Sequence, residues 1–414
     1  MSPIPKFTTI KPLVADFSYL DFNATTPPAE FLQTKVLEWM HQWGNPSSIH
    51  QAGRGPKTLL RDSRAKIAKL IGSENLETIF TAGGSEANNL ALKGVFEYAR
   101  THQNPRNEII ISSVEHPSLT KAAYALIPNG VKIHVLNVSR EGKIDLEQYQ
   151  SLLSEKTLLV SVMLANNETG TIFPIAEMAK LAHQRGALFH TDCVQALGKI
   201  DLNVKALGVD LASFAGHKFY ALKGVGVLFS ARGVNLMTQL QGGGQERSRR
   251  GGTENLLAIS SLAEMAAFQN QIGARGARLE QMRNHFEEEV LRQISDVTIT
   301  AHESPRLPNT SSLVIDGVDG ETLLMNLDMR GFAASTGAAC SSGSPEPSPA
   351  LLAMGLSRAE AQSSLRVGLG WSTTELEIEN FISTLVKVVE HLRGIKTLKS
   401  KVYSEAKDPC VCTN

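Results

Sequence analysis

The residues best suited to chemistry in this 414-residue chain follow apolar runs that predict buried strands. Asp192 ends the run that begins at Ala187, and Lys218 follows the run Leu211–Phe214. A lysine in a pocket can lose its proton and form a Schiff base with an aldehyde. A buried carboxylate beside a pyridine nitrogen keeps that ring protonated and able to accept electrons. Considered alone, Lys218 would be interpreted as a surface charge, and Asp192 could cap a following helix.

A third segment, Phe80–Asn89, follows a predicted strand and opens a predicted helix. Gly84, Ser85 and the first helical amides can surround an anionic group there, although a simple tight turn explains this segment equally well. The segment has neither a Walker lysine nor GxGxxG spacing. An anion cradle, a carboxylate for a pyridine nitrogen and a strand-end lysine, in this order, are the contacts that pyridoxal 5′-phosphate (PLP) requires. The three segments together predict a PLP-dependent enzyme.

These residues must be positioned by a regular alternation of strands and helices. Strands are expected at Thr78–Phe80, Glu108–Ile111, Val131–Val135, Leu158–Met163, Ala187–His190, Leu211–Phe214 and Val225–Phe229. Helices are expected at Ser85–Tyr98, Pro117–Ile127, Leu146–Leu153 and Pro174–Gln184. The alternation predicts an α/β fold with a large, doubly wound, mainly parallel sheet, whose strand ends would carry the active site.

A change of pattern after Gly252 predicts a second, smaller α+β domain. Two helices without an intervening strand, Thr253–Gln271 and Ala277–Ile294, come first. The remaining elements are strands at Val297–Thr300, Ser311–Ile315 and Leu365–Gly368, with helices at Gly320–Met329 and Glu375–Leu392. We expect a large domain over residues 21–270, and a small domain formed by 1–20 and 271–414. The Gly-, Ser- and Pro-rich segment Ser335–Pro349 predicts a mobile loop, and 394–414 a flexible tail.

Composition favours a small substrate over nucleic acid or membrane. Lysine plus arginine equals aspartate plus glutamate at 41 each, which removes the basic field that nucleic-acid binding needs. The four cysteines are scattered, as free thiols in a reducing cytoplasm would be. No export signal or membrane span is expected. Cys410 and Cys412 alone are too few ligands to predict a metal site.

Motifs along nearly the whole chain resemble one family. They are Tyr19–Pro27, Gly44–His50, Gly83–Asn89, Glu115–Ser118, Asn166–Gly170, Asp192–Gln195, Gly216–Lys218, Gly242–Glu246, Gly252–Asn255 and Gly337–Cys340. In this order they resemble the NifS/IscS-type cysteine desulfurases of the class V aminotransferase group. The resemblance implies a PLP-dependent homodimer of fold type I that converts L-cysteine to L-alanine.

The resemblance also implies a role for each site residue. Lys218 would bind PLP covalently and then move protons on the substrate, while His116 would stack on the pyridine ring. The other cofactor contacts would come from Gly84, Ser85 and His217 at the phosphate, Asp192 at the ring nitrogen, Gln195 and Asn167 at the phenolic oxygen or substrate carboxylate, and Thr253 of a second subunit at the phosphate. Without the family, His116 would be interpreted as a buried structural histidine and Thr253 as a helix N-cap.

Two further residues define the reaction. Arg366 matches the family's arginine for the substrate carboxylate, a role that suits a planar guanidinium, although a surface ion pair is the alternative. Cys340 lies in the loop segment, where a thiolate could attack the substrate sulfur and become a persulfide. An inert loop cysteine is the alternative. The 26 positions from Cys340 to Arg366 resemble the long-loop branch of the family, which implies sulfur transfer to a partner protein such as an iron–sulfur scaffold, or use in tRNA thiolation.

The chain departs from the family pattern at two places. Ala215 stands where the family has a serine, which predicts one missing hydroxyl contact to the phosphate, and Ala221 and Leu222 replace the usual Gly-Pro. Three alternatives to a desulfurase remain: a selenocysteine lyase, another class V PLP enzyme and, because of these departures, a PLP-fold scaffold with weakened catalysis. Cys340 argues against transamination, which needs no nucleophilic thiol.

Overall fold

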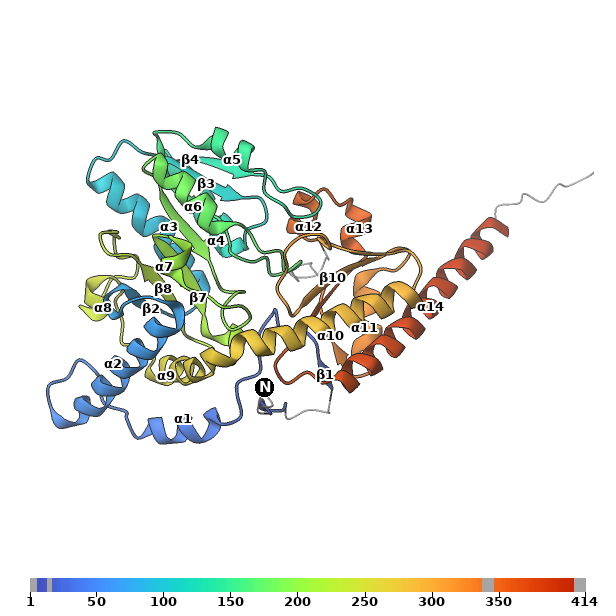
Figure 1. Cartoon of the computed structure of the whole chain (residues 1–414), viewed down its shortest axis with the longest axis horizontal. Coiled ribbons are helices and arrows are strands. Elements are labelled where there is room, and N and C mark those ends of the chain that lie inside the picture. Colours follow the sequence, from blue (N-terminus) through green and yellow to red (C-terminus); the bar gives the residue numbers. More distant parts are fainter. Residues whose placement is uncertain (1–5, 13–16, 337–345, 406–414) are drawn as a thin grey trace, which may run out of the picture.

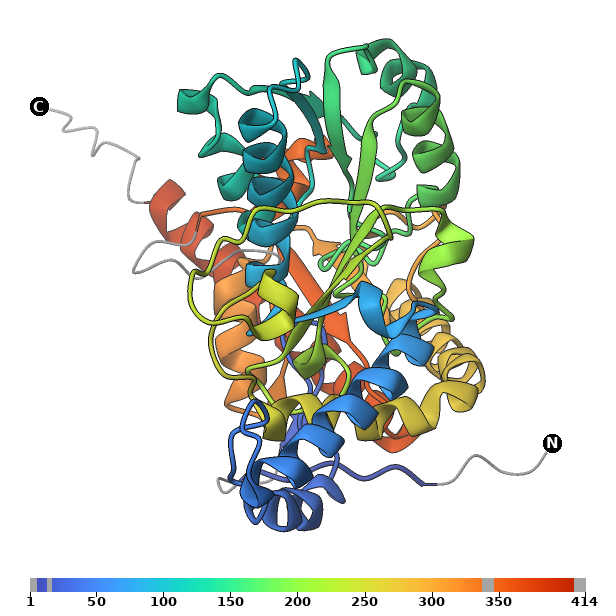
Figure 2. The same ribbon diagram turned by 90° about the vertical axis from the view of Figure 1, so that its left-hand side faces the viewer.

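A seven-stranded sheet forms the centre of the protein (Figures 1 and 2). The structure is a computed structural model that describes residues 6–12, 17–336 and 346–405. The strands are β2 (Thr78–Thr81), β3 (Glu108–Ser112), β4 (Lys132–Leu136), β5 (Thr157–Ser161), β6 (Leu188–Asp192), β7 (Leu211–Ala215) and β8 (Gly226–Ser230), in the order β2-β8-β7-β6-β5-β3-β4. Strand β8 is antiparallel to both neighbours, and the other pairs are parallel. The predicted α/β fold with a mainly parallel sheet is confirmed.

Helices cover both faces of this sheet. They are α1 (Leu32–Met40), α2 (Gln51–Ile71), α3 (Gly84–Thr101), α4 (Pro117–Tyr124), α5 (Leu146–Leu152), α6 (Ile175–Gln184), α7 (Val204–Leu207), α8 (Gln245–Ser248) and α9 (Leu256–Met265). Ile109 and Ile111 of β3 lie in the apolar core that contains Leu90 of α3, whereas Ile110 lies in the core that contains Met178 of α6. Because successive side chains point to opposite faces of a strand, an entirely apolar strand needs cover on both sides.

A smaller antiparallel sheet, in the order β12-β10-β9, lies beside the first. Its strands are β9 (Val297–Ile299), β10 (Thr310–Ile315) and β12 (Ser364–Gly368), and its helices are α10 (Ile272–Gln293), α11 (Gly320–Asp328), α12 (Pro349–Ala353), α13 (Arg358–Gln362) and α14 (Glu375–Glu405). Near the N-terminus, β1 (Ser18–Tyr19) pairs in parallel with β11 (Phe332–Ala333). In Figure 1, helix α10 runs from beneath the large sheet to the smaller one and joins the two parts.

The strand order of the large sheet reverses between β3 and β5. The chain leaves β3 for β4 at the sheet edge, and then returns to place β5 on the other side of β3. In α/β sheets, the crevice outside the carboxyl ends of the strands at such a reversal is where ligands bind. The segments that follow β3 and β5 carry His116 and Asn167, so the topology alone locates a candidate site.

Two features of the fold differ from the sequence-based expectation. Between β7 and β8 the chain forms only the short 3₁₀ turn Gly216–Lys218 and a loop, so β8 returns antiparallel. The apolar run at Val225–Phe229 predicted a strand but contained no information about its direction. Helix α14 also continues to Glu405, so residues 394–405, expected in the tail, are helical. Gly394 costs a helix only about 1 kcal/mol relative to alanine. Residues 337–345 and 406–414 lie outside the described residues.

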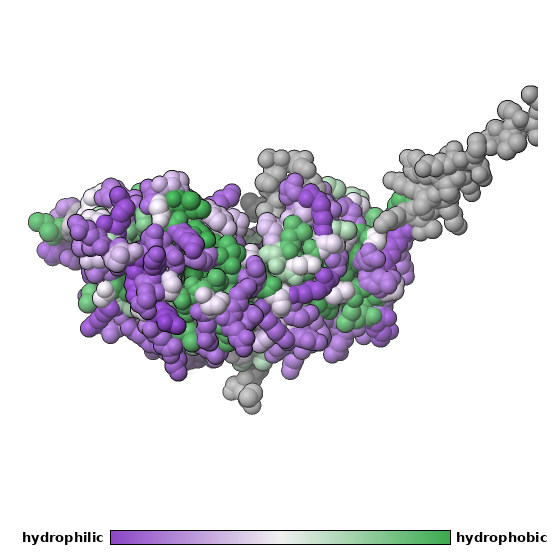
Figure 3. All heavy atoms as spheres, turned by 90° about the horizontal axis from the view of Figure 1, so that it is seen from above, coloured by the Kyte–Doolittle hydropathy of each residue, from purple (hydrophilic) through white to green (hydrophobic). Residues whose placement is uncertain are grey.

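The surface mixes polar and apolar residues. Figure 3 shows one face, on which hydrophilic residues surround separate apolar patches. Within the described ranges, no helix has the length and apolar character needed to cross a membrane. Several large apolar side chains are well exposed on α1 and the loop after it, namely Leu37, Met40, Trp43 and Ile49.

Close contact between β8 and the turn before α3 generates a stability prediction. A Cβ on Gly226 would lie 2.4 Å from the carbonyl carbon of Gly83, too close for any side chain. We expect Gly226→Ala to lower the free energy of unfolding by about 1–3 kcal/mol, as overpacking does, which urea denaturation would measure. Gly394→Ala is the control, because a Cβ there meets nothing within 4 Å. Equal stabilities of the two variants would contradict this packing argument.

Candidate functional site

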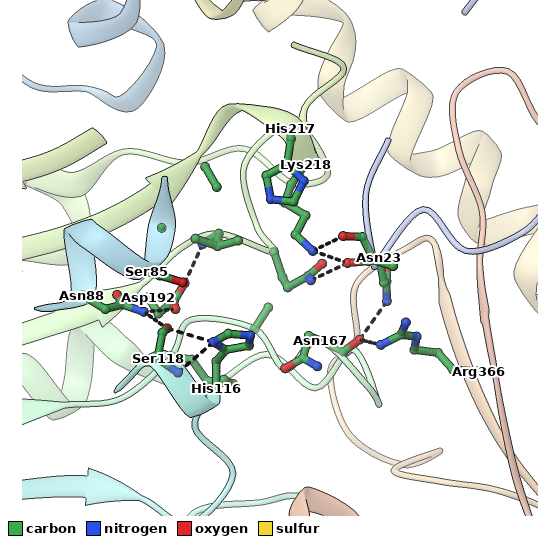
Figure 4. A pocket seen from close by; sticks show the side chains of 17 residues that line it. Asn23, Ser85, Asn88, His116, Ser118, Asn167, Asp192, His217, Lys218 and Arg366 are labelled. Carbon is green, nitrogen blue, oxygen red and sulfur yellow. Dashed lines mark hydrogen bonds between the residues drawn. The ribbon is translucent and has the colours of Figure 1, made fainter. Parts of the chain in front are cut away.

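A cavity of about 410 Å³ lies at the carboxyl ends of the central strands (Figure 4). This volume is within the range of about 300–1,000 Å³ that is typical of small-molecule sites. Its lining brings together most of the residues singled out from the sequence: Gly84, Ser85, His116, Asn167, Asp192, Gln195, His217, Lys218 and Arg366. All of them except Arg366 lie at or just after the carboxyl ends of five strands of the large sheet, because these ends meet at one edge of the sheet.

Lys218 extends from the turn after β7 toward the N-terminal segment. Its Nζ donates to the backbone carbonyl oxygens of Asn23 and Ala24, each at 2.6 Å. Burial and the positive charge of Arg366 lower the pKa of Lys218 to about 8, against the attraction of two nearby carboxylates. An amine with this pKa can hold or release a proton near neutral pH, and can act as a nucleophile.

Asp192, the last residue of β6, has a buried carboxylate, and each of its two oxygens accepts a hydrogen bond. Its Oδ2 accepts from Asn88 Nδ2 at 2.8 Å, and its Oδ1 accepts from the backbone N–H of Val194 at 2.9 Å. The second bond lies in the turn after β6, and no helix follows there for Asp192 to cap; the same carboxylate lines the cavity. Asn88 Oδ1 is buried without a hydrogen-bond partner among the described residues.

His116 faces the cavity from the start of helix α4. Its Nδ1 accepts from the backbone N–H of Ser118 at 3.1 Å, and so caps the helix. The side chain is exposed, so the interpretation as a buried core histidine is wrong. Desolvation by the surrounding protein lowers the pKa of His116, and Lys218 adds to this effect while Asp192 opposes it. The ring therefore offers a neutral, flat surface to a ligand.

The first turn of α3 forms the end of the cavity. A Cβ on Gly84 would lie 2.7 Å from Val194 Cγ2, so only glycine lets the backbone approach this closely. The first amides of a helix have no partner within the helix and attract anions. His217 lies nearby with its Nδ1 at 3.0 Å from Thr25 Oγ1, and burial followed by two lysine charges lowers its pKa to about 4. A neutral imidazole and free amides suit a phosphate group.

Arg366 reaches the cavity from β12 of the smaller sheet. It is 8% exposed, and its Nη2 donates to Asp21 Oδ1 at 2.8 Å. Its Nη1 donates to the backbone carbonyl of Asn167 at 3.2 Å, and its Nε is buried without a partner among the described residues. The expected alternative, a surface ion pair, is therefore wrong, because the pair exists but is buried beside the cavity. The unpartnered Nε leaves a donor for a ligand carboxylate.

Sequence reasoning missed the residues that connect these groups. The backbone carbonyl of Asn23 accepts from Lys218 and, at 2.9 Å, from Gln195 Nε2. Lys199 is buried next to them, and Asn88 holds Asp192. Asn23 and Asn88 fall within motifs that we noted, but their contacts depend on chain segments that are far apart in the sequence.

Two predicted residues remain to be located. Cys340 lies outside the described residues. Thr253 is exposed and does not line the cavity of its own chain. Its alternative interpretation as a helix N-cap is wrong, because Asn255 caps α9 by accepting from the backbone N–H of Ala258.

Comparison with known proteins gives concordant results. The sequence profile of the family "Aminotransferase class-V" matches residues 18–381. A protein named cysteine desulfurase IscS from Dictyoglomus turgidum is 41% identical over 391 residues, which cover 92% of this chain and 97% of that protein. A solved structure of a NifS-like protein covers 91% of this chain and all of that chain, with TM-score 0.84 and 31% identity. A structure described as SspA in complex with cysteine covers 85% of this chain and 98% of that chain, with TM-score 0.74 and 29% identity.

The buried carboxyl of Glu115, next to His116, generates a prediction about stability. Its Oε1 accepts from Ser112 Oγ at 2.5 Å and from the backbone N–H of Met163 at 2.8 Å, while its Oε2 has no partner among the described residues. Burial raises the pKa of Glu115 from 4.5 to about 8. The native state thus keeps a proton that the unfolded state loses, and stability falls as pH rises through this window.

We expect Glu115→Gln, which mimics the protonated acid and does not titrate, to become more stable than the wild type as pH rises from about 5.5 to about 9. Melting temperatures of both proteins across this range would measure the difference. The exposed Glu288 on α10 provides the control variant Glu288→Gln, whose difference from the wild type should change less with pH. A constant difference for Glu115→Gln would contradict the raised pKa.

Proposed function

Because this chain belongs to the aminotransferase class-V family, we propose that it is a PLP-dependent cysteine desulfurase that converts L-cysteine to L-alanine. One observation carries the proposal: a single cavity brings an amine, a buried carboxylate and a guanidinium with a free donor around one space. A relative named cysteine desulfurase IscS, 41% identical over nearly the whole chain, supports the same reaction.

The lining fits PLP in each of its parts. Lys218 supplies the amine for an aldehyde, and the buried carboxylate of Asp192 suits a protonated ring nitrogen. The remaining contacts would be His116 at the ring face, Gly84, Ser85 and His217 at the phosphate, and Gln195 and Asn167 at the phenolic oxygen or the substrate carboxylate. When bound, PLP supplies an electron sink that weakens bonds around the α-carbon of an amino acid.

The chain's own residues would bind cysteine and move its protons. Arg366 lines the cavity and its Nε has no partner among the described residues, so in this proposal it would donate to the substrate carboxylate. The amine of Lys218, with a pKa of about 8, can take up and return a proton at the substrate within the same cavity.

Cys340 is the sulfur acceptor in this proposal. Both described flanks of its segment are fixed beside the cavity: Ser335 exchanges backbone hydrogen bonds with Arg366, and Ser348 Oγ donates to Glu168. The Cys340 thiolate would attack the sulfur of cysteine and form a new S–S bond. The C–S bond then breaks, its electron pair stays with the carbon, and a proton completes alanine. The net change turns cysteine and a thiol into alanine and a persulfide.

We further propose a homodimer in a reducing cytoplasm, with a sulfur-acceptor protein such as an iron–sulfur scaffold as partner. The exposed apolar side chains on α1 and the loop after it, including Trp43 at 80% and Ile49 at 94% exposure, are consistent with a second copy covering them. Thr253, exposed and away from its own cavity, is available to the site of that copy. The free thiol of Cys193 is consistent with a reducing compartment.

The sulfur step is tested by removing its thiol. With L-cysteine and an external thiol, the wild type should release alanine and sulfide, and Cys340→Ala should release neither above background while it still binds PLP. Cys193→Ala removes a fully buried thiol and should keep most of the activity. Sulfide release by Cys340→Ala at the wild-type rate would exclude this acceptor, and PLP binding without any turnover in the wild type would favour a scaffold.

The departure at Ala215 generates a second test. Ala215 lines the cavity, and its Cβ lies 3.6 Å from the position of a Cβ on Gly84, next to the proposed phosphate site. A hydroxyl there would add one hydrogen bond to a charged group, so Ala215→Ser should bind PLP about tenfold more tightly. Titration of the cofactor-free protein with PLP, followed by tryptophan fluorescence, would measure this, and an unchanged affinity would remove the hydroxyl argument.

A further inference from the structure

Lys199 is a buried lysine without a carboxylate partner. It lies in the turn after β6, is 7% exposed, and forms no ion pair within the part of the chain that the structure describes. Its Nζ donates instead to two amide oxygens, Gln195 Oε1 at 2.7 Å and Asn23 Oδ1 at 2.9 Å. Burial of an amine without a counter-charge is costly, and an apolar side chain of equal length would avoid that cost. Packing alone therefore does not explain a lysine at this position.

The contact with Lys199 determines which way the Gln195 carboxamide points. A lysine amino group donates hydrogen bonds, so it must face Gln195 Oε1 rather than Nε2. With the oxygen held there, Nε2 is directed to the backbone carbonyl of Asn23 at 2.9 Å. Gln195 lines the main cavity, so the same constraint fixes the donor that this side chain presents to a ligand.

The contact with Asn23 fixes the other acceptor of the network. Asn23 Oδ1 receives Lys199 and, at 3.0 Å, Asn309 Nδ2, while the backbone carbonyl of Asn23 receives Gln195 and Lys218. Lys199 and Lys218 also border a common small cavity of about 10 Å³, about the space of one water molecule. Lys199 therefore donates to two residues beside the amino group of Lys218. The backbone carbonyl of Asn23 accepts from that amino group, and Gln195 donates to the same carbonyl.

We propose that Lys199 is a positioning residue of the PLP site, which orients the carboxamide of Gln195 and holds Asn23 so that Lys218 and Gln195 meet the cofactor in one fixed arrangement. The inference rests on the proposed function. Lys199 need not touch the cofactor.

The test measures PLP affinity of the cofactor-free protein, so it does not depend on turnover. Lys199→Met keeps the length of the side chain and removes both hydrogen bonds, and it should weaken PLP binding about tenfold or more. In the Gln195→Leu background the same substitution should weaken it by only about threefold or less, because one of the two residues through which Lys199 acts is already lost and only Asn23 remains. Lys66→Met, at an exposed lysine of α2 that pairs with Glu264, is the control and should leave the affinity unchanged.

A structural role alone predicts a different pattern. Lys199→Met would then lower the melting temperature, and its effect on PLP affinity would be the same in both backgrounds; that result, or an unchanged affinity, would overturn the proposal. Lys199→Leu, which likewise removes both hydrogen bonds, replaces Lys199→Met if the latter does not fold, with the same expected pattern. If the wild type does not bind PLP, the proposed function itself fails; if it binds PLP and releases sulfide but the Lys199 variants behave as the wild type, only this inference fails.

Discussion

Two backbone carbonyl groups, those of Asn23 and Ala24, hold the amino group of Lys218, and the arrangement of the site depends on this contact. It requires the N-terminal segment to lie against both sheets. Leu20 accepts from the backbone of Gly368 in the smaller sheet, and Thr26 donates from its backbone and its hydroxyl to the carbonyl of His217. The segment therefore connects β12 to the turn after β7, and a shift of either part would move the lysine. Carbonyl dipoles orient an amine without the full opposing charge that would keep it protonated.

The charges around the cavity favour an anionic ligand. Lys218 and Arg366 bring two basic groups to one region, and Asp192 and Asp21 oppose them. Two further acids are buried nearby, but burial raises the pKa of Glu115 to about 8 and that of Glu168 to about 7, so neither is fully ionised near neutral pH. The first turn of α3 adds the positive end of a helix dipole. These positive groups would stabilise both the phosphate of a ligand and the carboxylate of a substrate.

Sequence patterns predicted the strands of the large sheet and the position of Asp192 and Lys218 at strand ends, because apolar runs and strand-end polar residues are local signals. They did not predict the antiparallel course of β8, since a run of apolar residues is the same in either direction. They also missed Lys199 and Asn23. A buried lysine between two amide oxygens has no local signature, and the key acceptor of Asn23 is its backbone carbonyl, which every residue has. Thr253 was predicted at the site of a second subunit, and this stays a prediction.

The most direct test of the central claim is to identify the lysine that carries PLP. The PLP-loaded protein would be reduced with borohydride, digested, and mapped by mass spectrometry. Lys199 is buried, Lys218 is half-buried, and both border the same small cavity, so the experiment discriminates between two real candidates. The account predicts the modification on Lys218 alone. Modification of Lys199, or of neither lysine in protein that has bound PLP, would contradict it.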